Sequence, residues 1–142
     1  MIRLATADDA QAIAELCHDI RQDSVPSIHE VGGIEWYVTN ILIKRGSSHV
    51  FVEDGRVVAW LDVHDDWVDQ LYCKRSHTGK GIGKQLLDFA KTKSPIGLQL
   101  WTFQVNQGAR RFYQREGFAE VELTDGRNNE EKSPDVRLEW RP

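Results

Sequence analysis

The most recognisable chemistry in this chain lies in a glycine-rich turn at residues 78–84, with the sequence TGKGIGK. Its glycines alternate with other residues, which leaves room for successive backbone N–H groups to converge on an anion. A helix is expected to begin at the same place, and the positive end of its dipole also favours negative charge. Lys80 and Lys84 add positive charge to the turn. The turn therefore predicts a phosphate-binding site.

Two common phosphate-binding loops do not match the spacing of this turn. A P-loop has about four residues between its first glycine and its Gly-Lys pair, and Ser or Thr follows. Here three residues separate Gly79 from Gly83, and Gln85 follows Lys84. The dinucleotide-binding fingerprint needs another glycine where this chain has Leu86, and it needs a βαβ unit instead of the hairpins expected here.

A second motif lies downstream, in residues 106–118 with the sequence NQGARRFYQREGF. It resembles the motif Asn-x-x-Ala-x-x-Phe-Tyr-x-x-x-Gly-Phe of the GNAT superfamily of N-acetyltransferases, and the x-x-x-Gly-x-Gly spacing of the turn is similar to that family's coenzyme A loop. Residues 71–73 match its pantetheine-binding strand. The resemblance implies acetyl-CoA as co-substrate and no metal. The cofactor-binding residues that it implies are Leu71, Tyr72, Cys73, Thr78, Gly79, Lys80, Gly81, Ile82, Gly83, Lys84 and Asn106.

Thr78 departs from the family pattern, which usually has Arg or Gln at this position. A Thr hydroxyl can still meet a phosphate oxygen, but the charge of a guanidinium is missing. We therefore expect Lys80, Lys84 and the backbone amides of the turn to hold more of the pyrophosphate.

The resemblance also implies roles in catalysis. Tyr113 matches the family's general acid, which protonates the departing thiolate, although by spacing alone it fits an aromatic residue covering the sheet. The N–H of Leu71 or Tyr72 would polarise the thioester carbonyl. The acceptor amine has an unperturbed pKa of about 10 and must lose a proton before it attacks, so a base is needed. Asp69 is the first choice for the base. His64, His29 and Glu35 are alternatives for the base or for contacts with the acceptor.

Three functions are compatible with these motifs. The first is acetylation of the primary amine of a small molecule, by direct attack within a ternary complex. The second is acetylation of a protein N-terminus or lysine, which an open groove over Asp69 would favour. The third is a non-catalytic module that binds or senses acyl-CoA, which the departure at Thr78 favours and the presence of Tyr113 opposes. A homodimer is common among similar proteins.

The composition narrows the class of protein. The chain has 142 residues, 22 acidic against 18 basic side chains and a formal charge of −4, so no general positive field attracts nucleic acid. We expect a single domain over residues 1–142, located in the cytoplasm, with no membrane segment. The two cysteines, Cys17 and Cys73, are expected to be reduced core residues.

The elements that must position these residues follow from hydrophobic periodicity and turn signals. The expected fold class is α+β, with a mixed, mostly antiparallel twisted sheet of roughly six or seven strands and about four flanking helices, as in the GNAT fold. The strand after the glycine-turn helix should run parallel to the strand before the turn. Strands are predicted at residues 2–4, 50–53, 56–61, 67–73, 98–102, 118–123 and 136–140. Core or sheet-face positions are predicted for Trp36, Trp60, Trp67 and Trp101, one of which is available to line the acceptor pocket. Core positions are predicted for Phe112 and Phe118. Residues 125–134 are expected to form a solvated hairpin loop. The resemblance implies, as an alternative, that this hairpin borders the acceptor site or a dimer contact, where Glu130 and Glu131 would attract a cation.

Overall fold

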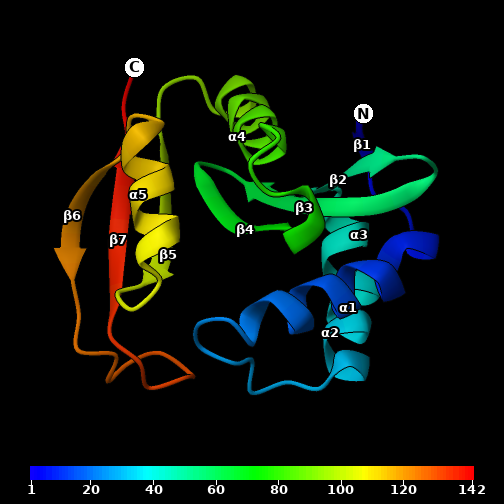
Figure 1. Ribbon diagram of the computed structural model, residues 1–142, viewed down its shortest axis with the longest axis horizontal. Helices are drawn as coiled ribbons and strands as arrows, with labels where there is room; N and C mark the ends of the chain where they lie inside the picture. The colour runs from blue at the N-terminus through cyan, green and yellow to red at the C-terminus, as the bar shows by residue number, and fades with distance from the viewer.

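A single seven-stranded sheet runs through the computed structural model, which describes all 142 residues (Figure 1). The strands lie in the order β1-β2-β3-β4-β5-β7-β6, and every neighbouring pair is antiparallel except β4 and β5. The parallel pairing expected from the sequence is therefore confirmed. The strands are β1 (Ile2–Leu4), β2 (Ser48–Glu53), β3 (Arg56–His64), β4 (Trp67–Cys73), β5 (Leu98–Phe103), β6 (Ala119–Leu123) and β7 (Asp135–Trp140).

Four helical segments flank the sheet, as expected. The second of them is continuous from residue 31 to residue 45 and contains a π-helical stretch that the sequence pattern did not predict. Two single turns of 3-10 helix complete the secondary structure. The helices are α1 (Ala10–Arg21), α2 (Val31–Tyr37) with η2 (Val38–Leu42) and α3 (Ile43–Arg45), α4 (Ile82–Lys93) and α5 (Gln107–Arg115), and the 3-10 turns are η1 (Ala7–Asp9) and η3 (Arg75–His77). None of the helices combines the length and the apolar character that a membrane span requires.

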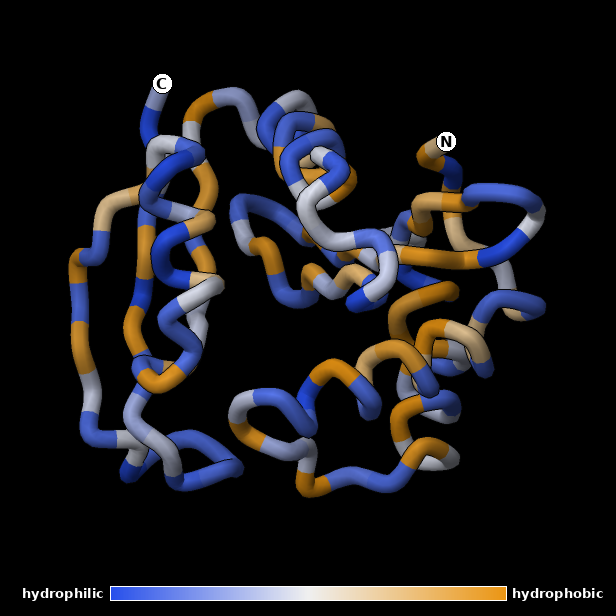
Figure 2. The backbone as a smooth tube through the Cα atoms, viewed as in Figure 1, coloured by the Kyte–Doolittle hydropathy of each residue, from blue (hydrophilic) through white to orange (hydrophobic).

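The two faces of the sheet bury separate hydrophobic cores. One core packs α4 and α5 against the sheet, and the other packs α1 and η2 against it. Along β3, Ala59 and Leu61 belong to the first core while Trp60 between them belongs to the second, as the alternation of side chains in a strand requires. Along β7, Val136 and Leu138 of the first core alternate with polar residues. This alternation appears as orange and blue segments in Figure 2. The sheet therefore separates a side covered by α4 and α5 from a side covered by α1.

The strands β4 and β5 pair only where they begin. Trp67 is opposite Gln99, and the Gln99 amide donates to the Asp66 carbonyl at 2.8 Å. Beyond this point the two strands diverge, and Figure 1 shows the gap between them in the middle of the sheet. The divergence leaves backbone groups and side chains of both strands facing an open space.

Several side chains expected in the core lie elsewhere. Trp60 is buried, at 2% exposure, but Trp36 on α2 is 61% exposed, so the prediction for Trp36 is wrong. Trp101 is exposed as well, but it lies on the face of β5 that α5 does not cover, which agrees with a sheet-face position. Phe118 is buried, whereas Phe112 is only half-buried. Hydrophobicity alone did not separate these cases, because amphipathic aromatic residues occupy both core and surface.

Candidate active site

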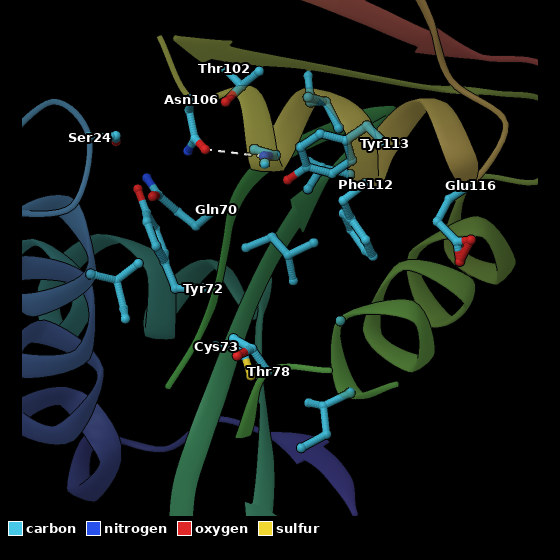
Figure 3. A pocket seen from close by; sticks show the side chains of 18 of the residues that line it. Ser24, Gln70, Tyr72, Cys73, Thr78, Thr102, Asn106, Phe112, Tyr113 and Glu116 are labelled. Atoms are coloured by element: carbon cyan, nitrogen blue, oxygen red, sulfur yellow. Dashed lines mark hydrogen bonds between the residues drawn. The ribbon is translucent and has the colours of Figure 1, made fainter. Parts of the chain in front are cut away.

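A cavity of about 1020 Å³ occupies the space between the diverging strands (Figure 3). It is continuous from the C-terminal end of α1, across β4 and β5, to the glycine turn and α5. This size lies at the upper end of ligand pockets. Residues from all of these elements line the cavity, including Arg21, Asp69, Gln70, Leu71, Tyr72, Cys73, Thr78, Gly79, Gly81, Ile82, Gly83, Lys84, Trp101, Asn106, Phe112, Tyr113 and Arg115.

The glycine turn presents unpaired backbone donors at one end of this cavity. Gly79 and Gly81 have φ angles of 77° and 80°, a left-handed conformation that side chains disfavour. Gly81 is the N-cap of α4, so the first N–H groups of the helix have no partner within it. Gly83 is helical, and a Cβ built on it would lie 3.3 Å from Cζ of Phe112. The glycines thus have two separate purposes, namely backbone conformation and close approach to α5.

The backbone of β4 also has donors directed at the cavity. The Lys74 amide donates to the Val58 carbonyl at 2.8 Å. Because hydrogen-bonded pairs alternate along antiparallel strands, the Tyr72 N–H is also turned toward β3, opposite Trp60. The N–H groups of Leu71 and Cys73 are then turned toward the open side. Of the two amides predicted to polarise a carbonyl, the register favours Leu71.

Tyr113 reaches the cavity from α5. This helix begins where the Asn106 side chain accepts a hydrogen bond from the Ala109 amide at 3.1 Å, which confirms Asn106 as its N-cap. The Tyr113 ring packs between Phe112 and Phe118, at centroid distances of 5.2 and 5.7 Å. Its hydroxyl points into the cavity in Figure 3. Burial raises the pKa of Tyr113 above its ordinary value, so the phenol keeps its proton at neutral pH.

Asp69 lies at a β-bulge on β4 and lines the same cavity. Asp62 is opposite Gln70, and Val63 is opposite Val68, so Asp69 is the extra residue in the ladder. Burial, and after it the negative charge of Asp62, raise the pKa of Asp69. Arg45 opposes this shift through a contact of 3.4 Å to Oδ2 of Asp69. A carboxylate with a raised pKa inside a cavity is suited to accept a proton.

A buried polar cluster behind Asp69 was not predicted from the sequence. Asp62 is fully buried on β3 and accepts hydrogen bonds from Ser48 Oγ at 3.0 Å and from Arg45 Nη2 at 2.8 Å. The Ser48 hydroxyl in turn accepts from Trp60 Nε1 at 3.0 Å. The one sequence signal for this cluster was Asp62 itself, a charged residue inside the otherwise apolar run of residues 57–63.

The other residues proposed for the base or for acceptor binding lie outside the cavity. His64 is at the end of β3, opposite Trp67, with its ring 3.7 Å from the Asp65 carboxylate. His29 contacts Glu130 at 3.1 Å on the surface. Glu35 belongs to α2 and does not line the cavity. Since only Asp69 among the acidic and His candidates lines the cavity, it stays the prediction for the base.

The cationic side of the glycine turn is weaker than expected. Lys84 Nζ lies 3.2 Å from Asp88 and 3.5 Å from Glu116, so acidic neighbours already share its charge. Lys80 does not line the cavity. The Thr78 hydroxyl donates to the Arg75 carbonyl at 2.9 Å, which leaves it no proton for a phosphate oxygen. Backbone amides are therefore the main donors that this turn offers.

Arg115 is a cationic residue that lines the cavity, and the sequence motifs did not predict it. It lies on the last turn of α5, and its guanidinium is 5.6 Å from the centre of the Phe112 ring. It lines the cavity together with Gly83 and Lys84 of the first turn of α4. Arg115 is thus placed to add the charge that Thr78 lacks. Its position in the motif, between Tyr113 and Gly117, gave no signal for this role.

The loop between β6 and β7 is tied to the other half of the molecule. Glu131 pairs with Arg21 of α1 at 2.8 Å, and both side chains are largely buried, at 14% and 15% exposure. Glu130 pairs with His29 at 3.1 Å. Glu131 therefore already has a cationic partner within the chain, whereas Glu130 is 65% exposed and its attraction for an external cation stays a prediction. The loop thus bridges to α1 beside the cavity.

Known proteins resemble this chain in sequence. The model of the Acetyltransferase (GNAT) domain matches residues 45–120. An uncharacterised N-acetyltransferase of Methanocaldococcus jannaschii is 28% identical over 108 residues, which cover 64% of this chain and 47% of that protein. The chain therefore spans about half the length of this curated relative.

Solved structures share the fold over nearly the whole chain. The apo form of YjaB from Escherichia coli has a TM-score of 0.80 at 17% identity, with coverage of 99% of this chain and 96% of that chain. The PaiA N-acetyltransferase of Thermoplasma acidophilum, solved in complex with coenzyme A, has a TM-score of 0.73 at 21% identity, with coverage of 100% and 98%. These similarities confirm the fold class expected from the sequence.

Proposed function

Because the chain belongs to the GNAT acetyltransferase family, we propose that it moves an acetyl group from acetyl-CoA to the primary amine of a small molecule. The observation that carries this proposal is the opening between β4 and β5, which forms one cavity with two sides. The glycine turn and Tyr113 belong to the side covered by α4 and α5. Asp69 and the C-terminal end of α1 face the other side. A donor and an acceptor entering from opposite sides would meet in the gap between the strands.

The residues present fit coenzyme A, which supplies the acetyl thioester when it is bound. The left-handed Gly79 and Gly81 and the free amides at the start of α4 would hold the pyrophosphate. The N–H and C=O groups of Leu71 and Cys73, left unpaired by the departure of β5, would pair with the amides of pantetheine. Arg115 would add the positive charge that the turn itself lacks.

Three groups of this chain would then carry the reaction. Asp69 accepts the proton of the acceptor ammonium, directly or through water, so that the free amine can attack the carbonyl carbon. The Leu71 N–H stabilises the negative charge that develops on the carbonyl oxygen. Tyr113 would give its proton to the sulfur as the carbon–sulfur bond breaks. The second proton that the nitrogen loses on becoming an amide would pass to solvent, and solvent would restore the proton of Tyr113.

Attack by the amine itself, without an acyl-enzyme, is the route that these residues support. Cys73 is the only thiol that lines the cavity. Burial raises the pKa of this thiol, and its Sγ lies 3.6 Å from its neighbour Lys74's carbonyl rather than beside a base. A thiol that stays protonated is a poor nucleophile.

A small acceptor is favoured over a polypeptide by the bridge beside the cavity. The Arg21–Glu131 and His29–Glu130 contacts connect the β6–β7 loop to α1 and to the segment that follows it. A polypeptide acceptor would need an open groove past Asp69. This bridge supports a bounded acceptor site, and the charge of Asp69 favours a cationic amine within it.

Measuring thiol release from acetyl-CoA across a panel of small amines and of peptides tests the proposal. We expect release with one or more small amines and its loss in Tyr113→Phe. Turnover with peptides alone would replace the small-molecule assignment with a protein acceptor. Tight binding of acetyl-CoA without release by any amine or peptide would remove the catalytic assignment and leave a binding module.

A further inference from the structure

Asp62 is a fully buried carboxylate in the middle of β3. A buried charge is costly unless donors surround it. Here Ser48 Oγ donates to Oδ1 at 3.0 Å, and Arg45 Nη2 donates to Oδ2 at 2.8 Å. The Ser48 hydroxyl is itself fixed by a bond from Trp60 Nε1 at 3.0 Å. The cluster has no direct contact with the glycine turn, and the proposed reaction does not use it.

Arg45 connects this buried carboxylate to Asp69. Its Nη2 lies 2.8 Å from Asp62 but 3.4 Å from Asp69, and its Nε donates to Ser47 Oγ at 3.0 Å. The left-handed Gly46, with φ of 73°, turns the chain from α3 into β2 and so brings Arg45 beside the sheet. The guanidinium is therefore anchored on the side of Asp62. Its bond to Asp69 is at the long limit for a hydrogen bond.

We propose that Asp62 is a positioning residue that holds Arg45 back from Asp69 and so leaves the Asp69 carboxylate free to take the proton of the acceptor amine. This proposal rests on the proposed function, in which Asp69 is the base. Arg45 would orient Asp69 without neutralising it, because the shorter pair is the one with Asp62. The bulge in β4 contributes by removing Asp69 from the regular ladder.

The charges around Asp69 support the assignment of Arg45 to Asp62 instead of Asp69. Asp62 on β3 repels the Asp69 carboxylate, while Arg45 on α3 and His64 on β3 attract it. These are the charged groups that act on Asp69 from the elements beside it, and burial adds to the effect of Asp62. If Asp62 lost its charge, Arg45 would have Asp69 as its only carboxylate partner. The Asp69 carboxylate would then be more strongly paired and less basic.

The test compares Asp62→Asn with Arg45→Gln, and it uses Asp8→Asn as a control, because Asp8 is an exposed acidic residue that forms no ion pair with Arg45. The titration of the Asp69 carboxyl is followed by carbon-detected NMR in the free protein, and kcat/KM is measured against pH in parallel. We expect the Asp69 midpoint to fall by about one pH unit in Asp62→Asn and to rise by about one pH unit in Arg45→Gln. Asp8→Asn should leave it in place.

The two readouts separate this inference from the proposed function. If the NMR midpoint of Asp69 moves in opposite directions in the two variants, and the acid limb of the kcat/KM profile moves with it, both the inference and the proposed function are supported. Opposite NMR shifts without a shift of the rate profile support the Asp62–Arg45–Asp69 linkage and remove Asp69 as the base. An unmoved midpoint in folded Asp62→Asn, or a shift of the same sign in both variants, would overturn the inference. If Asp62→Asn does not fold, Arg45→Gln alone carries the test, and an unmoved or lowered midpoint there has the same negative meaning.

Discussion

Phe112 approaches the backbone of Gly83 so closely that a Cβ at position 83 would force the ring to shift by a few tenths of an ångström. A Cβ on Gly83, in the first turn of α4, would lie 3.3 Å from Cζ of Phe112 on α5. Phe112 packs in turn against Tyr113 at a centroid distance of 5.2 Å. The contact therefore couples the turn that we assign to pyrophosphate with the helix that carries the proposed acid.

Gly83→Ala should separate cofactor binding from stability. Ala is a better helix former than Gly by roughly 0.5–1 kcal/mol, which offsets the cost of shifting Phe112, so the variant should keep a stability close to that of the wild type. The new methyl group displaces Phe112 and should weaken coenzyme A binding, as measured by calorimetry. Gly32→Ala is the matched control, since nothing lies within 4 Å of a Cβ at that helical position. Equal affinities in both variants would show that the Gly83–Phe112 contact does not shape the site.

Gly81→Glu should abolish coenzyme A binding. The carboxylate would occupy the space assigned to the pyrophosphate and repel it, and the left-handed φ of 80° adds backbone strain of about 1 kcal/mol or more. Gly55→Glu is the control for strain, because Gly55 has a φ of 75° in the β2–β3 turn and does not line the cavity. A Gly81→Glu variant with wild-type affinity would contradict the assignment of this turn.

Tyr113→Phe should lower kcat by about a hundredfold or more while changing the affinity for coenzyme A little. The ring contacts with Phe112 and Phe118 are retained, so the loss should come from the missing proton alone. Tyr37→Phe, an exposed tyrosine on α2, serves as the control. Parallel losses of affinity and turnover would instead make Tyr113 a structural residue.

The pH dependence of kcat/KM should reflect Asp69 on the acid side. The pKa of Asp69 is raised, so the basic form is lost as pH falls through a midpoint above the usual value of about 3.9. The pKa of Tyr113 is raised as well, so this acid stays protonated up to at least pH of about 10. Asp69→Asn should remove the acid limb and lower the rate by about a hundredfold or more. An unchanged acid limb in that variant would assign it to another group.

Glu131→Gln should destabilise the fold and raise KM for the acceptor. The Arg21–Glu131 pair is largely buried, and removing one charge leaves Arg21 without its carboxylate, at a cost of about 1–3 kcal/mol. Glu130→Gln is the matched control, because its pair with His29 is 56% and 65% exposed and should contribute less than about 1 kcal/mol. Denaturant unfolding and acceptor kinetics measure both effects, and similar results for the two variants would contradict the bridging role of Glu131.

Local sequence signals predicted the elements well where backbone chemistry decides the outcome. Asn106 caps α5 through a bond to an amide three residues along, and Gly46 ends α3 in the left-handed conformation. Such signals depend on neighbours within a turn or two, so they can be read along the chain. Aromatic residues were harder, because residue type does not distinguish Trp36 from Trp60 and the two have opposite burial.

The sequence by itself determined the family, the fold class and the glycine turn, because each depends on residue spacing over short segments. Only the tertiary structure decided which candidates share the cavity. It brought Asp69 and Tyr113 to the gap between β4 and β5 and left His64, His29 and Glu35 outside it. It also gathered Arg45, Asp62 and Asp69 from three elements. The divergence of two strands and a one-residue bulge set these positions, and both arise from long-range pairing that no local pattern encodes.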